Sequence, residues 1–416
     1  MNWYRNFDWV LFFSWVALTT FGLIAIYSAT QGPVSDFLPA FIQQNFKKQF
    51  TWVGLSFLMV IVLQFTAPRT FSQIAYFLYG LCILLTIGTL FVGVEVNGAK
   101  SWIVLGSMRF QVSELMKVAT VLAVANYLSS RRNISMERLG SAVSATLLII
   151  VPGVLVLLQN DTGTALVIFS LTPFLLFWSG LPYGISLFIV SPALVGYFSV
   201  IQWYWGVLAS FIIVVLIFII QKRVWLTISS AIMNLLIVAG VNVALNNVLQ
   251  AYQKARIQAF INPQFDPKGW GWNVIQAKTA IGSGGVTGKG FMEGTQTQLR
   301  FLPEQWTDFI FCVIGEEFGF VGSVLIVVLF MTLIIRLIYG AGQHKHPFAQ
   351  SVLVGVASIY LIHFIINTGS ALGLLPVIGL PLPFVSYGGS AFLSNSLMLG
   401  ISLNLLLYKR EFSMYI

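Results

Sequence analysis

Charged residues are scarce in this chain, and their scarcity excludes a water-soluble surface over most of it. Only 8% of the 416 residues are charged, whereas 57% are hydrophobic; soluble domains carry about 25% charged residues. Cysteine and histidine are also rare, with two and three copies. Because Cys82 and Cys312 both lie in apolar runs, we expect neither a disulfide framework nor a cysteine-based metal site.

The net charge of +9 would suit a nucleic-acid partner in a soluble protein. In a membrane protein the placement of the charges matters more than their sum, so we expect no nucleic-acid partner. The first apolar stretch begins near Trp9 and is about as long as a bilayer-spanning helix. It therefore predicts a membrane helix rather than a cleavable signal peptide.

Long apolar runs predict an all-α, polytopic membrane bundle of about ten to twelve transmembrane helices. A span needs roughly 20 mostly apolar residues, because about 30 Å of hydrocarbon must be crossed at about 1.5 Å per residue. The predicted spans are 9–29, 48–67, 72–93, 112–130, 139–158, 162–180, 184–201, 205–221, 225–249, 309–337, 350–373 and 390–408. A re-entrant pair within 184–249 would lower the count.

Lys and Arg in the short loops orient these spans, because such residues gather on the cytoplasmic side. With the N-terminus inside, the cytoplasmic side carries Arg5, Arg69, Arg131, Arg132, Arg138, Lys222, Arg223, Arg336, Lys345, Lys409 and Arg410. The short external loops carry only Lys47, Lys48, Lys100 and Arg109. Both termini are therefore predicted to be cytoplasmic. Residues 250–308 then form a large extracytoplasmic loop within one membrane domain, 1–416, and its interleaved aromatics indicate an ordered surface.

Glu114 and Lys117 are the ionisable residues that stand out inside a predicted span. Their spacing of three places them on one face of a helix, and Lys117 would lie within the apolar layer. Such a group usually faces the bundle interior with a partner and marks a functional site. The alternative is a structural ion pair, with Ser113 capping the helix. We favour the functional interpretation.

Two aspartates in the predicted external loops can be explained by local backbone structure. Asp161 can cap the following helix through the amides of Gly163 and Thr164, and we favour that role. Asp266 precedes Pro267, which favours an extended backbone. A carboxylate presented in this way could be a general base, but Asp-Pro is also an ordinary turn. From spacing alone the turn is the better interpretation.

The glycine-rich run 282–290 (GSGGVTGKG) does not fit the Walker pattern. Its backbone, with Lys278, Lys289 and Arg300 nearby, could bind pyrophosphate, and a flexible turn is equally compatible with it. Glu304 and Asp308 could order the loop or hold a divalent cation such as Mg²⁺ or Mn²⁺. The uncharged segment 373–392 is rich in Pro and Gly, which predicts irregular backbone buried against protein.

These segments together resemble the SEDS family (shape, elongation, division and sporulation) along most of the chain, and its elongation branch more than its division branch. The matching motifs are NGAKSW (97–102), QVSELMK (111–117), NDTGTAL (160–166), NPxxDPxGxGWN (262–273), IGSGGVTGKG (281–290), GTQTQLRFLPEQWTDFIF (294–311), EEFGFVG (316–322) and GLLPVIGLPLPFVSYGGS (373–390).

The chain departs from the family pattern at five positions. Ser101, Val112, Ser370, Ile378 and Ala391 stand where Arg, Pro, Met, Thr and Ser are common. The serine at 101 removes a second phosphate contact beside Lys100. The family typically has ten spans, so the prediction above adds two between 184 and 249, which keeps 250–308 outside.

The resemblance implies a glycosyltransferase that polymerises lipid II, the undecaprenyl-pyrophosphate disaccharide-pentapeptide, at the outer face of a bacterial cytoplasmic membrane. It maps the family's essential loop aspartate onto Asp266, which reverses the interpretation from spacing alone. It likewise assigns substrate-binding roles to Glu114, Lys117 and Trp102. Lys100, Lys117 and Lys289 would stabilise the leaving pyrophosphate, with a divalent cation as a further option.

Partners are implied by the same resemblance. They are undecaprenyl-pyrophosphate-linked glycan, a class B penicillin-binding protein that crosslinks the strands, and other membrane proteins of the elongation complex. A lipid II flippase using Glu114 and Lys117 is the main alternative. Such a transporter would be expected to show repeats or paired broken helices, and no second copy of SELMK or DPKG occurs. A silent scaffold and a polytopic acyltransferase are further alternatives, the latter weakened because His363 is the only histidine predicted within a span.

Overall fold

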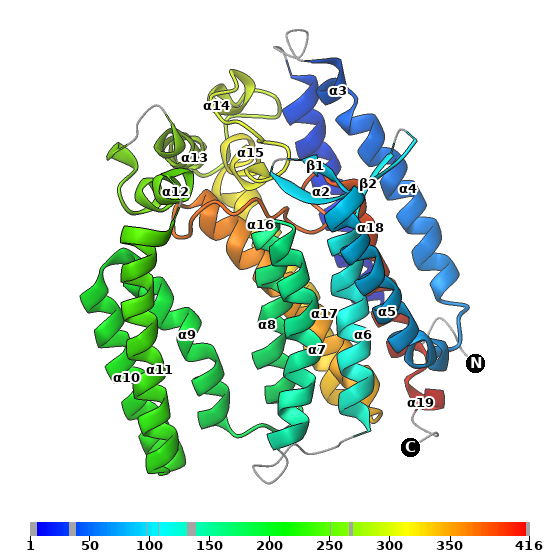
Figure 1. Cartoon of the computed structure of the whole chain (residues 1–416). Helices are drawn as coiled ribbons and strands as arrows, with labels where there is room; N and C mark the ends of the chain where they lie inside the picture. Colours follow the sequence, from blue (N-terminus) through cyan, green and yellow to red (C-terminus); the bar gives the residue numbers. More distant parts are fainter. Residues whose placement is uncertain are drawn as a thin grey trace. The chain divides into compact units, whose positions relative to one another are not determined.

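The computed structural model describes residues 6–32, 39–96, 98–106, 108–130, 139–249, 251–265 and 269–412. They are mostly helical, with one small sheet (Figure 1). The chain divides into two compact units. Unit 1 comprises Met1–Arg132, Ser144–Thr172 and Asn273–Ile416, and unit 2 comprises Asn133–Val143 and Pro173–Trp272.

Within the described residues, ten helices are long and apolar enough to cross a membrane, which confirms the predicted polytopic fold. The long helices lying wholly or mostly in unit 1 are α2 (Trp9–Gln31), α4 (Asn45–Leu63), α5 (Pro68–Val92), α6 (Val112–Ser129), α7 (Leu139–Leu158), α8 (Thr162–Trp178), α16 (Gly319–Gln343), α17 (Pro347–Ala371) and α18 (Gly389–Leu407). Two of these lie outside the ten: α8 is only 17 residues long, and α6 carries Glu114 and Lys117.

Several helix starts follow from local sequence. Asp8 precedes α2 and accepts a hydrogen bond from the amide of Leu11, one of the amides that a helix start leaves unpaired. Pro68 and Pro347 occupy the first positions of α5 and α17, where a missing amide hydrogen costs nothing. These features explain why the helices begin where they do.

Helices α17 and α18 form the core of unit 1. In their most apolar windows 78% and 83% of residues are buried, against 22–44% in the other candidate spans. The outer helices therefore present most of their apolar side chains outward, as lipid-facing helices do. Polar side chains on α18, including Ser394, Asn395 and Asn404, are buried and form hydrogen bonds inside the bundle.

A three-stranded antiparallel sheet precedes α6 and was not predicted. Its strands are β1 (Val94–Val96), β2 (Ala99–Leu105) and β3 (Met108–Gln111), in the order β1-β2-β3. Trp102 pairs with Val94 on one side and Gln111 on the other. Because α6 begins at Val112, directly after Gln111, the sheet fixes the start of the helix that carries Glu114 and Lys117.

The predicted span 309–337 is wrong at its start. Residues 310–317 form a separate short helix, α15 (Ile310–Glu317), and α16 begins only at Gly319. Gly319 has φ +63, and an added Cβ would lie 2.3 Å from the amide nitrogen of Gly288. The glycine-rich run therefore packs into this break, where Lys289 N and Gly290 N donate to Glu316 O and Glu317 O.

The segment between α17 and α18 has the predicted irregular backbone, but only its second half is buried as predicted. Leu380, Leu382, Phe384 and Val385 are all at most 4% exposed, whereas Leu374 is 59% exposed. Side chains satisfy its backbone: Asn367 donates to Leu380 O, and Ser386 Oγ accepts from Leu382 N. Gly22 of α2 lies against it so closely that an added Cβ would approach Phe384 O to 2.6 Å.

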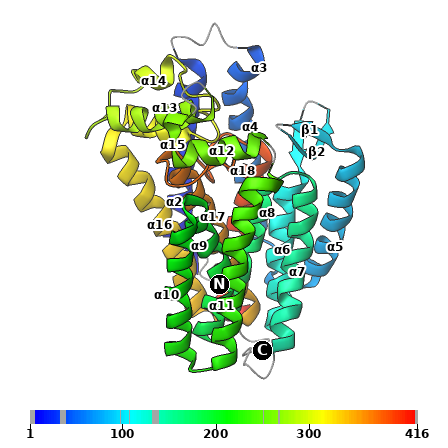
Figure 2. The same ribbon diagram turned by 60° about the vertical axis from the view of Figure 1, so that its left-hand side comes forward.

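Figures 1 and 2 show two ends of unit 1. The sheet, α14 (Thr295–Gln298) and α15 lie at one end, and α19 (Lys409–Phe412) lies toward the other. Helix α3 (Ala40–Gln43) lies at the same end as the sheet. The functional candidates Lys100, Trp102 and Lys289 therefore belong to the sheet end of the bundle.

Unit 2 contains residues 184–249, which were predicted to hold three spans, and the structure confirms three long apolar helices there. Its helices are α9 (Tyr183–Ile201), α10 (Trp203–Gln221) and α11 (Val224–Val243), followed by a π-helical turn η3 (Ala244–Val248), α12 (Ala251–Ile261) and the 3₁₀ turn η4 (Pro263–Phe265). Buried Ser191 donates to Asn234 Oδ1 between α9 and α11. Helix α13 (Trp270–Ser283) follows, with its residues up to Trp272 in unit 2 and the rest in unit 1. The described residues of 250–308 are ordered in helices and turns, as the aromatics of this segment predicted.

Candidate functional site

A buried ion pair occupies the first turns of α6. Lys117 Nζ lies 2.9 Å from a carboxylate oxygen of Glu114, and the two side chains are 0% and 2% exposed. The predicted pairing is confirmed. Glu114 lies in the first helical turn, where a negative charge is favoured by the unpaired amides and the helix dipole.

His363 of α17 completes the surroundings of Lys117, and its Nε2 lies 3.0 Å from Lys117 Nζ. The other ring nitrogen, Nδ1, lies 3.0 Å from Pro381 O. A carbonyl can only accept and an ammonium can only donate. The geometry therefore defines a neutral imidazole with its hydrogen on Nδ1, which accepts from Lys117 and donates to the irregular segment.

Ser394 of α18 closes the cluster from the carboxylate side. Its hydroxyl donates to Glu114 Oε2 over 2.8 Å. Residues from three helices and one irregular segment thus surround a single buried cation, and we call Glu114, Lys117, His363 and Ser394 the buried cluster. His363 and Ser394 were not predicted as members, since they lie 246 and 280 residues from their partners. The signal available in the sequence was that His363 stood alone among apolar residues.

Asp161 anchors the start of α6 to the start of α8. Its Oδ1 accepts from the amide of Thr164, which confirms the predicted cap, although through Thr164 and not Gly163. Its Oδ2 accepts from Gln111 Nε2 at 2.7 Å and Ser113 Oγ at 2.8 Å. The alternative in which Ser113 caps α6 is therefore not supported, because Ser113 lies inside the helix and its hydroxyl donates to Asp161.

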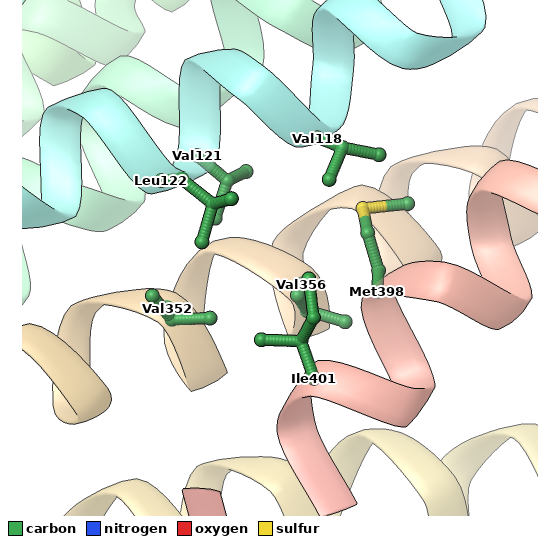
Figure 3. A pocket seen from close by; sticks show the side chains of 7 residues that line it. All are labelled: Val118, Val121, Leu122, Val352, Val356, Met398 and Ile401. Atoms are coloured by element: carbon green, nitrogen blue, oxygen red, sulfur yellow. The ribbon is translucent and has the colours of Figure 1, made fainter. Parts of the chain in front are cut away.

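An apolar plug lies directly beyond the cluster along α6 (Figure 3). It is lined by Val118, Val121, Leu122, Val352, Val356, Met398 and Ile401 from α6, α17 and α18. These side chains leave no space among them that admits a water molecule. Electrostatic interactions are stronger in a dry, weakly polar surrounding, so the plug strengthens the field of the charges beside it.

Lys100 and Trp102 lie on β2, two residues apart, where the pairing of β2 with β1 is irregular. The Lys100 side chain is exposed and Trp102 is half-buried. The amide of Lys100 donates to Gln159 O, which fixes the strand against the end of α7. Since Trp102 pairs with Gln111, both residues lie on the sheet that leads into the buried cluster.

Lys289 forms a salt bridge with Glu316 of α15 at 2.7 Å. Burial alone would raise the pKa of Glu316, but hydrogen bonds from Lys289 and from the amides of Gln296 and Thr297 bring it below its ordinary value. The amides of Lys289 and Gly290 are also engaged by carbonyls. The glycine-rich run is therefore an ordered turn whose lysine holds the loop to α15.

Lys278 and Arg300 are the other predicted phosphate-binding residues of the segment 250–308. Lys278 of α13 is exposed and lies close to Gly373, where an added Cβ would meet its Cε. Arg300 has φ +60 and is half-buried, and burial lowers the pKa of its guanidinium. Within the described part of the chain, neither side chain forms a salt bridge with an acidic residue.

Glu304 and Asp308, the predicted cation ligands, lie in the segment before α15. Glu304 accepts from Thr307 Oγ1 at 3.3 Å, and the backbone carbonyl of Asp308 accepts from Asn367. Among the described residues, no group of three or more His, Cys, Asp or Glu side chains is placed to hold a metal ion. Asp266 lies outside the described residues, between η4 and α13.

Comparison with known proteins relates the whole chain to one family. The family described as "Cell cycle protein", comprising FtsW, RodA and SpoVE, matches residues 8–208 and 205–411. A relative from Escherichia coli K12, "Peptidoglycan glycosyltransferase MrdB", is 31% identical over 398 residues, 96% of this chain and 93% of the relative. "Peptidoglycan glycosyltransferase RodA" of Treponema pallidum is 30% identical, covering 96% of this chain and 97% of its own.

Solved structures of proteins with related names are also similar to this chain over almost its whole length. One described as "Structural coordination of polymerization and crosslinking by a peptidoglycan synthase complex" matches with TM-score 0.70 and 27% identity, over 97% of this chain and 99% of the other. The crystal structure of the rod shape determining protein RodA from Thermus thermophilus matches with TM-score 0.63 and 27% identity, over 97% and 98%. This protein belongs to the FtsW, RodA and SpoVE family.

Proposed function

We propose that this chain polymerises lipid II into peptidoglycan glycan strands, with the buried cluster as the positive centre of its active site. The chain is a peptidoglycan glycosyltransferase, in keeping with relatives that match it from end to end. The observation that supports this site best is a fully buried lysine held by one carboxylate and one neutral imidazole. A buried cation with its partners at membrane depth is costly and marks function.

The reaction needs one general base and one positively charged group. The 4-hydroxyl of the acceptor's N-acetylglucosamine attacks the anomeric carbon of the growing strand, and the bond from that carbon to the pyrophosphate oxygen breaks. Asp266 takes the hydroxyl proton, and the pyrophosphate departs with its undecaprenyl chain as an anion. Asp266 has this role by resemblance to the family motif in 262–273.

Lys117 stabilises the negative charge that develops on the leaving pyrophosphate. A preorganised charge in a dry site is worth far more than the same charge in water, and the apolar plug excludes water on the side away from the sheet. Exposed Lys100 on β2, together with Lys278 and Arg300, supplies further positive charge to phosphates. Lys289 acts indirectly, by holding the loop through Glu316.

The membrane topology is part of the same proposal. The chain lies in the bacterial cytoplasmic membrane with both termini inside, because the Lys and Arg residues of its short loops gather on that side. The sheet end of unit 1 then faces outward, and so do Lys100 and the segment 273–308. A class B penicillin-binding protein is proposed as partner, supported by the match to a subunit of a peptidoglycan synthase complex.

A purified sample in detergent distinguishes polymerisation from the alternatives. Fluorescent lipid II is incubated with the protein, with and without Mg²⁺ or Mn²⁺, and the products are separated by gel electrophoresis. We expect a ladder of glycan strands. A flippase or a silent scaffold makes no strands in detergent, so unreacted lipid II under all metal conditions would reject the proposed function.

A further inference from the structure

A polar cavity lies in unit 1 at the opposite end from the sheet. It is bordered by the start of α2, the last turns of α16, the end of α18, and α19, and it holds about 290 Å³ of space that water can enter. Its charged side chains are Asp8, Arg336, Lys409 and Arg410. We call it the basic pocket.

Asp8, the only acid among the described residues that line the pocket, is already paired. Asp8 accepts from the amide of Leu11 and from Arg336 Nε, which lies 3.1 and 2.8 Å from its two oxygens. Only Nε of Arg336 is engaged in this pair, so the forked end of its guanidinium keeps donors for another anion. The Arg336 side chain is 37% exposed, which leaves that end accessible from the pocket.

Two further cations lie close together on the other wall. Lys409 Nζ donates to the neutral Gln343 Oε1 at 3.0 Å. Burial, and then the nearby charge of Arg410, lower the pKa of Lys409. Like charges close together repel each other, and an anion bound beside Lys409 would offset this repulsion.

We propose that the basic pocket binds the phosphate group of an anionic lipid headgroup. The pocket lies where three membrane helices end, so a phosphodiester could enter it while acyl chains stay along the outer surface of the bundle. Basic pockets between transmembrane helices on the cytoplasmic side are suited to such headgroups. This binding is separate from glycan polymerisation and does not depend on it.

Binding of fluorescent phosphatidylglycerol to the purified full-length protein in detergent tests the pocket. Unlabelled phosphatidylglycerol should displace the probe, and phosphatidylcholine, which has no net charge, should not. The double variant K409Q/R410Q keeps the Asp8–Arg336 pair. At about 1 kcal/mol for each basic residue near anionic lipid, it should weaken binding roughly 10- to 30-fold.

A matched control removes the same charge elsewhere. K222Q/K345Q also loses two positive charges from the same predicted side of the membrane, and neither residue lines the pocket; its affinity should stay within about twofold of the parent. Because K409Q/R410Q could disturb α19, Gln343→Glu gives a second route. It adds an acid beside Lys409 without removing a cation, and it should weaken binding by a similar factor.

The outcomes separate the sources of the phosphate. If inorganic phosphate displaces the probe as well as phosphatidylglycerol does, with the same loss in K409Q/R410Q, the pocket is a phosphate site for a soluble ligand and the lipid assignment is rejected. Equal weakening in the pocket variants and the control, or equal displacement by phosphatidylcholine, would overturn the proposal as a whole.

Discussion

His363 and Lys117 are 246 residues apart in the chain, yet His363 Nε2 and Lys117 Nζ lie 3.0 Å apart with both side chains fully buried. Through Nδ1, the same imidazole reaches Pro381 O. His363 therefore connects the cation of α6 to the irregular segment between α17 and α18. One neutral ring thus contacts both the buried cation and the irregular segment between α17 and α18.

Substitution of His363 should separate positioning from packing. His363→Gln keeps an oxygen that can accept from Lys117, whereas His363→Phe fills the space but leaves an ammonium hydrogen unpaired. An unsatisfied buried donor costs about 1–3 kcal/mol, so we expect His363→Phe to lose roughly tenfold or more in polymerisation rate. His363→Gln should retain most of it. Equal activity in the two variants, at equal melting temperature, would show that the hydrogen bond to Lys117 has no role in polymerisation.

Glu114→Gln should destabilise the protein as well as inactivate it. The change leaves Lys117 buried without its counter-charge, and breaking a buried pair in this way costs about 3–5 kcal/mol. The double variant Glu114→Gln/Lys117→Met removes both charges, so it should recover much of that stability while staying inactive. Denaturant unfolding in detergent measures both. A double variant as unstable as Glu114→Gln would contradict the assignment of the loss to an unpaired charge.

Asp266→Asn should abolish strand synthesis while leaving expression and melting temperature near those of the parent. The amide keeps the size of the side chain but cannot take the proton of the attacking hydroxyl, and general-base catalysis contributes about 10²–10⁴-fold. The lipid II assay in detergent gives the measurement, with Asp266→Ala alongside. Near-normal strand synthesis by either variant would remove Asp266 from the mechanism.

The Lys289–Glu316 bridge should make the stability of the fold around α15 sensitive to acid. The folded pKa of Glu316 is lowered, so the pair stabilises the fold above the unfolded pKa of about 4.3. That contribution is lost as pH falls through the lower folded value. Glu316→Gln should therefore be less stable than the parent at pH 7, with the difference shrinking below about pH 4. A difference that stays constant across this range would contradict the linkage.

The helices and the Glu114–Lys117 pair could be predicted because both depend on short-range sequence. Long apolar runs predict membrane-spanning helices, and a spacing of three residues predicts that two side chains lie on the same face of a helix. The buried irregular segment was also predictable, since uncharged Pro- and Gly-rich sequence such as 373–392 has few other places in a membrane protein. The predicted roles of Lys100, Trp102, Lys278 and Arg300 remain predictions, as does that of Asp266.

The remaining features depend on contacts that no local pattern encodes. His363 and Ser394 join the cluster only through the packing of α17 and α18 against α6. The break before Gly319 is imposed by the glycine-rich run, whose amides bond to Glu316 and Glu317. The sheet at 94–111 did leave a signal, an Asn-Gly pair between alternating residues, which is typical of a hairpin turn.

Lys117→Met tests the central claim most directly, because it removes the buried cation and keeps much of the side-chain volume. Strand synthesis from fluorescent lipid II is measured in detergent for the parent, Lys117→Met, and the matched control Lys47→Met, whose lysine is exposed. We predict a loss of about 10²–10³-fold in rate for Lys117→Met and a rate close to the parent's for Lys47→Met. A folded Lys117→Met protein that polymerises lipid II at the parent's rate would contradict the account.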